Sequence, residues 1–300
     1  LAQAADASTA DDVLPTVTVV GSTPLPGLGV PRNQLPSAVF AAGAAELARS
    51  QASTLGEFLD RSLASVHLNE MQGNPFQADV NFRGYTASPL LGTPQGLSVY
   101  LDGMRLNQPF GDVVSWDLIP RAALNTLTLM PGSNPLFGLN TLGGALSLTS
   151  KDGFSHPGTV VEAGYGAHQR RMFGFEHGGH QDNGLNWFVT GNLHRDDGWR
   201  EASPSDVRQL FAKLGWSGEA TDLAASLNWA DNRLTGNGLQ DARLLANDYR
   251  SVYSRPDETQ NRSWALNLTG KHQLNDRLLL SGNAYYRNLH TRTLNGDLNE

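Results

Sequence analysis

Histidines are the residues of this sequence most suited to metal chemistry. His177 and His180 are separated by two glycines, a spacing that metal ligands often have. The glycines favour a turn instead, and we expect no metal site there. His194 stands just before a long polar segment and is a candidate ligand contact, with a hydrated position on the polar face of a strand as the alternative. His67 is explained by an ordinary core or loop role.

Catalytic arrangements are not indicated. Asp196 and Asp197 are adjacent carboxylates in a polar loop, whereas a catalytic pair needs opposed environments. The glycine-rich stretch 138–144 lacks the Lys-Ser/Thr ending of a phosphate-binding loop. No serine, histidine and aspartate stand in a supporting context. We therefore expect no catalytic residue, no cofactor and no enzymatic activity.

Three aromatic residues are candidates for binding a small molecule. Tyr85, Phe110 and Trp116 stand in loops rich in glycine, proline and asparagine. Loops carry many binding residues because a rigid scaffold can hold them at the surface. Simple packing of these loops against the rest of the fold is an equally good interpretation.

Composition excludes several classes of protein. The 300 residues contain no cysteine, and 22 Lys+Arg against 29 Asp+Glu give a net charge of -7. A disulfide scaffold is impossible, and a nucleic-acid binder would need a basic face that this composition scarcely supplies. No apolar run approaches the ~20 residues of a membrane helix. A transmembrane β-barrel stays possible, because its strands are only ~9–11 residues of alternating polarity.

Residues 1–36 are predicted to be a tether. The first seven residues resemble the trimmed end of an export signal. Thr16–Val20 is a β-branched run entered by Pro15 and followed by glycines and prolines, which predicts a short extended strand without a local partner. Another protein could add its own strand to such a segment. The alternative is that the run pairs within its own fold.

Residues 37–152 are predicted to form a compact domain with a small mixed sheet and helices. Thr54 and Glu57 form a capping box before a helix that has one apolar face. Residues 97–101 and 104–106 flank Asp102-Gly103 and predict a hairpin. Further strands are expected at 79–83, 126–130 and 145–149, with a small helix after Pro120.

From about Gly158 the polarity alternates with a period of two, which predicts a half-buried antiparallel sheet. Trp216, Trp229, Tyr165 and Tyr286 stand near the ends of the apolar stripes, where membrane barrels place aromatic girdles. The predicted apolar face is Val161, Ala163, Tyr165; Leu185, Trp187, Val189, Gly191, Leu193; Leu210, Ala212, Leu214, Trp216; Leu223, Ala225, Leu227, Trp229; Trp264, Leu266, Leu268; and Leu278, Leu280, Gly282, Ala284, Tyr286. The predicted polar face includes Asn186, Thr190, Asn192, His194, Ser226, Asn228, Asn267, Thr269, Lys271, Ser281, Asn283 and Arg287.

Connections between the predicted strands also alternate in length. Turns are expected around 178–180, at 218–219 and at 274–276, whereas 195–206 and 232–260 are long. Short turns at one end and long loops at the other are typical of outer-membrane barrels. The first connection on the long side, near Ala167, is short and departs from this rule.

Residues 14–300 resemble the N-terminal part of a TonB-dependent outer-membrane receptor. Thr16, Val17, Thr18 and Val19, with Leu14-Pro15 before them, resemble the TonB box. Asn81-Phe82-Arg83-Gly84 is similar to the Arg-Gly strand of the plug, and Val99–Leu101 with Asp102 and Gly103 is similar to its Asp-Gly hairpin. Residues 132–138, ending in Gly138, and residues 142–151, which contain Gly143 and Gly144, resemble the motif that closes the plug before the barrel.

This resemblance implies a plug (37–152) followed by the first part of a β-barrel (153–300) in the bacterial outer membrane. It implies energised uptake of a scarce small molecule, most often an iron chelate of the siderophore type, and TonB, the inner-membrane energy transducer, as partner. Outer-membrane lipid is the other expected partner, and nucleic acid is not. A passive pore or surface-binding barrel with a vestigial plug is the alternative.

About seven strands are expected after Gly158, whereas barrels with plugged lumens have about 22. Seven tilted strands cannot close around a plug. We therefore expect the chain to be a piece of a longer protein and its sheet to have open edges.

Overall fold

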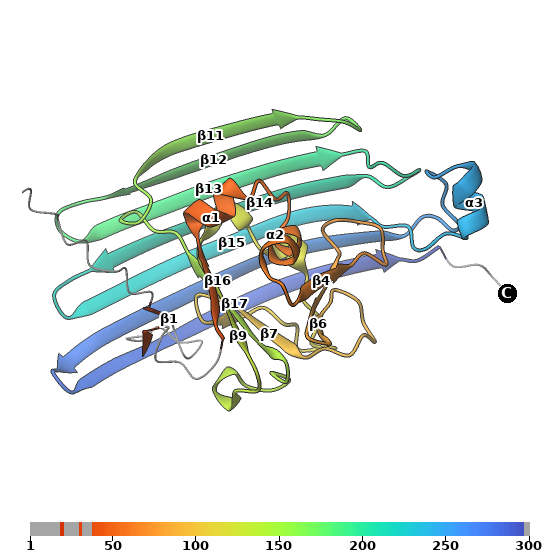
Figure 1. Cartoon of the computed structure of the whole chain (residues 1–300). Coiled ribbons are helices and arrows are strands. Elements are labelled where there is room, and N and C mark those ends of the chain that lie inside the picture. Colours follow the sequence, from red (N-terminus) through yellow and green to blue (C-terminus); the bar gives the residue numbers. More distant parts are fainter. Residues whose placement is uncertain (1–18, 21–29, 32–37, 297–300) are drawn as a thin grey trace, which may run out of the picture.

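The computed structural model describes residues 19–20, 30–31 and 38–296. A compact α/β domain, residues 38–152, lies against one face of a long, curved antiparallel sheet (Figure 1). We call this seven-stranded sheet the wall. Within the described residues, no helix has both the length and the apolar character needed to cross a membrane.

The compact domain contains two small sheets. The larger has the strand order β3-β9-β10-β7-β8, in which β10 and β7 are parallel and the other neighbours are antiparallel. The smaller has the order β4-β5-β6. The predicted small mixed sheet is confirmed, and the expected hairpin is β7–β8. The strands are β3 (Phe40–Gly43), β4 (Val66–Asn69), β5 (Asp79–Phe82), β6 (Tyr85–Ala87), β7 (Leu97–Leu101), β8 (Met104–Arg105), β9 (Leu124–Pro131) and β10 (Gly144–Ser150).

Short helices cover these sheets. α2 (Leu55–Ser62) begins where the capping box predicts, because the Thr54 hydroxyl accepts a hydrogen bond from the Glu57 amide at 3.2 Å. Its apolar face buries Phe58 and Leu59 in the core, and the helix lies against β4 and β5 of the smaller sheet. The remaining helices are α1 (Ala44–Arg49) and the single turns η2 (Trp116–Leu118), η3 (Arg121–Ala123) and η4 (Pro135–Phe137). η3 follows Pro120, as expected.

In the wall, each strand is hydrogen-bonded to its sequence neighbours in the order β11 to β17. The registers place the predicted apolar residues on the outer face, where Leu214, Leu223 and Leu280 are about half exposed. The predicted polar residues line the inner face, against the compact domain. The strands are β11 (Gly158–Tyr165), β12 (Arg171–His180), β13 (Leu185–Asp196), β14 (Ser205–Ser217), β15 (Thr221–Thr235), β16 (Glu258–Asn275) and β17 (Leu278–Leu294).

The wall has a turn end and a loop end. Tight turns at 181–184, 218–220 and 276–277 lie at the turn end, and the longer connections 197–204 and 236–257 lie at the loop end. The second of these contains α3 (Ala242–Asn247), which stands far from the tight turns (Figure 1).

The turn expected around Gly178-Gly179-His180 is wrong, since these residues complete β12. Gly178 is needed inside the strand because a side chain there would collide with the His156 carbonyl oxygen and the Phe188 ring.

The expectation that the Thr16–Val20 run lacks a local partner is wrong where the structure describes it. β1 (Val19–Val20) pairs antiparallel with β2 (Val30–Pro31). The pairing within its own fold is therefore the correct alternative for these two residues. Thr16, Val17 and Thr18 lie outside the described residues.

Candidate functional site: the interface of the compact domain and the wall

Asp117 forms the most deeply buried polar contact between the two parts. Its side chain is 1% exposed and accepts hydrogen bonds from the Nδ2 atoms of Asn232 on β15 (2.8 Å) and Asn261 on β16 (3.0 and 3.1 Å). No cation pairs with this carboxylate among the described residues. Burial raises the pKa of Asp117, and the two asparagine donors counteract part of that rise.

Amide side chains of the wall also bind the backbone around η2. Gln209 donates to the Asp117 carbonyl at 2.6 Å, Asn232 donates to the same oxygen at 2.8 Å, and Asn228 donates to the Leu118 carbonyl at 3.1 Å. With Asn261, these residues of β14, β15 and β16 hold one turn of the compact domain. These bonds satisfy backbone groups that burial would otherwise leave unpaired.

A second contact involves the β7–β8 turn. The Asp102 carboxylate accepts from the amide and hydroxyl of Ser150 at 2.9 and 2.5 Å. Lys213 on β14 donates to the same hydroxyl at 3.0 Å, and Asn267 on β16 donates to the Asp102 carbonyl at 2.9 Å. Gly103 completes the turn with φ +80°. The Asp-Gly turn therefore binds both the end of β10 and the wall.

A third contact comes from β17. The Arg287 guanidinium donates to the carbonyl oxygens of Leu106 at 2.6 Å and Asn107 at 3.1 Å. These two residues begin the segment 106–112, which follows β8. A single side chain of the wall therefore holds the first two residues of this segment.

The loop end contributes a fourth contact. Asn74 donates to the Ser205 hydroxyl at 2.9 Å and to the Thr235 carbonyl at 3.0 Å. Arg200 holds the connection 236–257 by donating to the carbonyls of Asn237 (2.6 Å) and Ser251 (3.1 Å). The loop around Asn74 is therefore bound to the loop-end termini of β14 and β15, and Arg200 joins the two long connections beside it.

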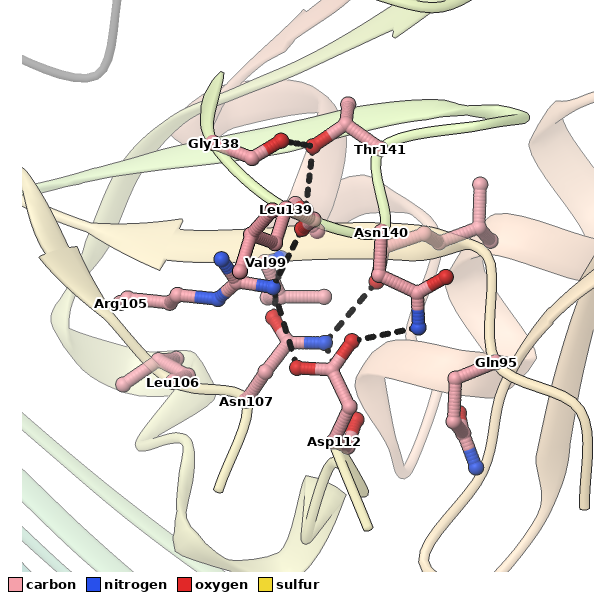
Figure 2. Close-up of polar contacts among 12 residues, drawn as sticks. Gln95, Val99, Arg105, Leu106, Asn107, Asp112, Gly138, Leu139, Asn140 and Thr141 are labelled. Atoms are coloured by element: carbon pink, nitrogen blue, oxygen red, sulfur yellow. Dashed lines mark hydrogen bonds and ion pairs between the residues drawn. The ribbon is translucent and has the colours of Figure 1, made fainter. Parts of the chain in front are cut away.

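Polar side chains also join the segment 106–112 to the glycine-rich stretch 132–144 (Figure 2). Arg105 donates to Asp112 at 3.0 Å and to the Leu139 carbonyl at 2.7 Å. Asn140 donates to the other oxygen of Asp112 at 2.8 Å. Asn107 donates to the Asp112 carbonyl at 3.2 Å, and its own side-chain oxygen accepts from the Val99 amide at 2.8 Å.

A cavity of about 790 Å³ opens beside this polar cluster, between the compact domain and β17. Phe110 lines it and is 78% exposed. Arg105, Tyr285 and Arg287 also line it, so the cavity combines two guanidinium groups with two aromatic rings. Its volume is in the range of small-molecule sites.

Trp116 and His194 line a different cavity, of about 710 Å³, between the compact domain and β11–β13. Trp116 is 7% exposed, and its indole donates to the Ala87 carbonyl at 3.2 Å, which favours the packing role over ligand contact. His194 is also 7% exposed and lies edge-on to Phe76, with ring centroids 5.0 Å apart.

Tyr85 lies in neither cavity. Its ring packs over Gly96 and Gly143, where an added Cβ would collide with it. The structure therefore does not bring the four candidate contacts to one site: Phe110 lies in one cavity, Trp116 and His194 line another, and Tyr85 covers two glycines.

The remaining motif residues occupy special backbone positions. Arg83 and Gly84 form the β5–β6 turn with φ of +52° and +87°, and Asn81 accepts from the Gly84 amide at 3.1 Å. Gly138 (φ +77°) ends η4 close to the Arg105 guanidinium. Gly144 (φ +155°) has no room for a Cβ against the Met130 carbonyl. These positions explain the glycines of the closing motif.

The His177 and His180 side chains do not converge. The spacing of three places them on opposite faces of β12. His177 bonds to the Thr159 hydroxyl at 2.9 Å and His180 to the Gly153 carbonyl at 3.1 Å. Among the residues that the structure describes, no group of three metal-binding side chains is present.

Comparison with known families identifies the compact domain. The family described as TonB-dependent Receptor Plug Domain matches residues 31–145. The chain contains a TonB-dependent receptor plug domain. The resemblance predicted from the sequence motifs is thereby confirmed for this domain. We now call residues 38–152 the plug. No curated protein matches the chain.

Solved structures show the same fold for plug and wall together. The ferric citrate transporter FecA superposes with a TM-score of 0.71 at 16% identity, covering 87% of this chain and 41% of that structure. The ferric yersiniabactin uptake receptor FyuA from Yersinia pestis gives 0.67 at 18% identity, with 86% and 41% covered. The ferripyoverdine receptor of the Pseudomonas aeruginosa outer membrane gives 0.67 at 11% identity, with 95% and 40% covered.

The chain therefore spans about two fifths of the length of these receptors. The predicted fold class, a plug followed by antiparallel strands that do not close into a barrel, is confirmed. Sequence reasoning missed Asp117 and Asn261 as interface residues, whereas it placed Asn228, Asn267 and Arg287 on the inner face.

Proposed function

We propose that this chain is the plug and first barrel strands of an outer-membrane receptor that takes up a scarce ligand, an iron chelate of the siderophore type, using energy from TonB. The observation that carries the proposal is the seating of a TonB-dependent receptor plug on the polar face of a sheet whose other face is apolar. Names of similar structures, such as ferric citrate transporter, support the ligand class.

Insertion in the outer membrane is supported by the wall. Its outer face carries exposed leucines, and Trp229 lies opposite Trp264 across β15 and β16. Aromatic residues at the limit of an apolar band are typical of barrels at the lipid interface. Short turns face the periplasm in such barrels, so we assign the turn end to that side and the loop end to the outside.

The 790 Å³ cavity is our candidate for ligand contact. Arg105 and Arg287 supply positive charge, and Phe110 and Tyr285 supply flat apolar surface. An anionic chelate with aromatic or conjugated groups suits this combination. Binding there would press on the segment 106–112, whose polar contacts reach the glycine-rich stretch of the plug.

Thr16, Val17, Thr18 and Val19 are our candidate for the TonB-binding strand. Strand addition supplies backbone hydrogen bonds that can transmit a pulling force. The two-residue pairing of β1 with β2 is short, so little structure opposes its exchange for a partner strand.

Uptake of a radiolabelled ferric siderophore by cells with and without a proton gradient tests this function. We expect accumulation with the gradient and only surface binding without it. Accumulation that is independent of the gradient would instead support the passive pore. Growth of a deletion strain on different iron sources would then narrow the ligand.

A further inference from the structure

Arginines gather on the outer face of the wall near its loop end. One row of direct cross-strand partners extends over the six strands β12 to β17, and four of its six residues are arginines. The row is Arg171, Arg195, Asp206, Arg233, Gln260 and Arg292. The adjacent row lies toward the turn end. In it, Arg208 is the cross-strand partner of Leu193, and Arg262 is the partner of Asp231 on one side and of His290 on the other. We call the six arginines of these two rows the arginine belt.

The two acids of these rows are already engaged within them. Arg208 donates to both oxygens of Asp206, at 2.9 and 3.0 Å, and Arg262 lies 3.3 Å from Asp231. Of the described carboxylates, none forms an ion pair with Arg171, Arg195, Arg233 or Arg292. Asp197 and Glu258 stand one step further toward the loop end. The arginine belt therefore carries a local excess of positive charge in a chain whose net charge is -7.

Arg171 and Arg195 are direct cross-strand neighbours on the exposed face. Like charges in that position repel one another and destabilise the pairing of the strands. An anion shared by the two guanidinium groups would reverse this effect, because arginine binds phosphate with two parallel hydrogen bonds.

The height of the belt on the wall indicates where that anion lies. Arg233 follows Trp229 by four residues of β15, which is about 13 Å along the strand, or about 10 Å along the membrane normal for a tilt near 40°. Trp229 and Trp264 mark the limit of the apolar band, so Arg233 lies in the layer of lipid headgroups. Arg195, two strands away in the same tilted row, lies within about 6 Å of that height.

We propose that the arginine belt binds the phosphate groups of an anionic lipid in the outer leaflet. This inference rests on the proposed insertion of the wall in the outer membrane. The lipid chains would cover the leucines on the turn-end side of Trp229 and Trp264. The phosphates would bridge Arg195 and its neighbours on adjoining strands. The receptor would then carry specifically bound lipid, a property separate from ligand uptake.

Native mass spectrometry of the full-length protein in a non-ionic detergent tests the proposal, with diphosphorylated lipid A as probe. Removing two belt arginines in R195Q/R233Q should weaken lipid A binding roughly 10- to 30-fold, since each basic residue near an anionic lipid surface contributes about 1 kcal/mol. The matched control is R250Q/R277Q, because these exposed arginines stand in a loop and a turn away from the belt.

Equal binding by R195Q/R233Q and wild type, or equal binding of dephosphorylated lipid A, would overturn the proposal. Displacement of lipid A by millimolar inorganic phosphate would also overturn it, by revealing a site for free phosphate. Siderophore uptake by R195Q/R233Q should match wild type. Failure of the proposed uptake function would therefore appear in the transport assay, independently of lipid binding.

Discussion

Asp117 of the plug and Asn261 of β16 share hydrogen bonds of 3.0 and 3.1 Å although 144 residues separate them in the chain. The bond joins a single helical turn to the middle of the wall, where burial removes competition from water. A hydrogen bond to a charged group in such a place is stronger than one at the surface. This contact therefore contributes to the seating of the plug on the wall.

Replacing Asp117 with alanine should loosen the plug. The Asn261 amide would lose its acceptor and Asn232 would keep only the backbone carbonyl of residue 117, at a cost of about 2 to 4 kcal/mol. We expect faster protease cleavage of the plug in the full-length protein, with the barrel intact. Asp182→Ala, in an exposed turn, is the matched control and should behave as wild type. Identical cleavage of D117A and D182A would contradict the assigned role.

The raised pKa of Asp117 predicts a pH dependence of stability. Between the ordinary value of 3.8 and the higher folded-state value, the folded protein binds more protons than the unfolded one. Stability from this group therefore falls as pH rises through that window. The wild-type midpoint of thermal unfolding should rise relative to that of D117N as the pH is lowered from 7 toward 4. Equal changes of the unfolding midpoint with pH in the two proteins would contradict a raised pKa of Asp117.

Gly144→Ala should disturb the closing motif. Its φ of +155° and the nearby Met130 carbonyl leave no space for a Cβ, so β9 and β10 must separate locally. We expect a loss of roughly 2 to 4 kcal/mol in the unfolding free energy of the full-length protein. Gly43→Ala is the control, because nothing lies within 4 Å of its Cβ position and its φ is ordinary. Similar stability of the two variants would argue against a steric role for Gly144.

Phe110→Ala tests the cavity beside β17. Its exposed ring would cover a bound chelate, and its loss should weaken ferric-siderophore binding by about tenfold, equivalent to about 1.4 kcal/mol. Binding can be followed by quenching of tryptophan fluorescence in the full-length protein. Leu136→Ala, at another exposed apolar plug residue outside that cavity, should bind as wild type. Unchanged affinity of F110A would move the ligand site elsewhere.

The two faces of the wall were predictable because side chains of a strand alternate. Asn228, Asn267 and Arg287 stood on the expected polar face for that reason. Their plug partners were not predictable, since these bonds join residues more than 100 positions apart. Asp117 carried no local signal of its own, because an acid in the first turn of a helix is ordinary.

One local prediction failed because a tertiary contact outweighed local chemistry. Gly178 suggested a turn, but the backbone of His156 passes so close that a strand there requires glycine. Trp116 was open to two interpretations, ligand contact or packing, and the bond from its indole to the buried Ala87 carbonyl favours packing. Both outcomes depend on a close approach between segments distant in sequence.

Val17→Pro tests the proposed TonB-binding strand. Proline removes one backbone donor and fixes φ, so a partner strand could not pair across this position, whereas the plug core is untouched. We expect energised uptake to be lost while binding of the ferric siderophore at the cell surface stays at the wild-type level. Val17→Thr keeps the backbone donor and the β-branched side chain, and it should transport normally. Uptake by V17P at the wild-type rate would show that residues 16–19 are not the strand that TonB binds, because the ladder of hydrogen bonds cannot tolerate the substitution.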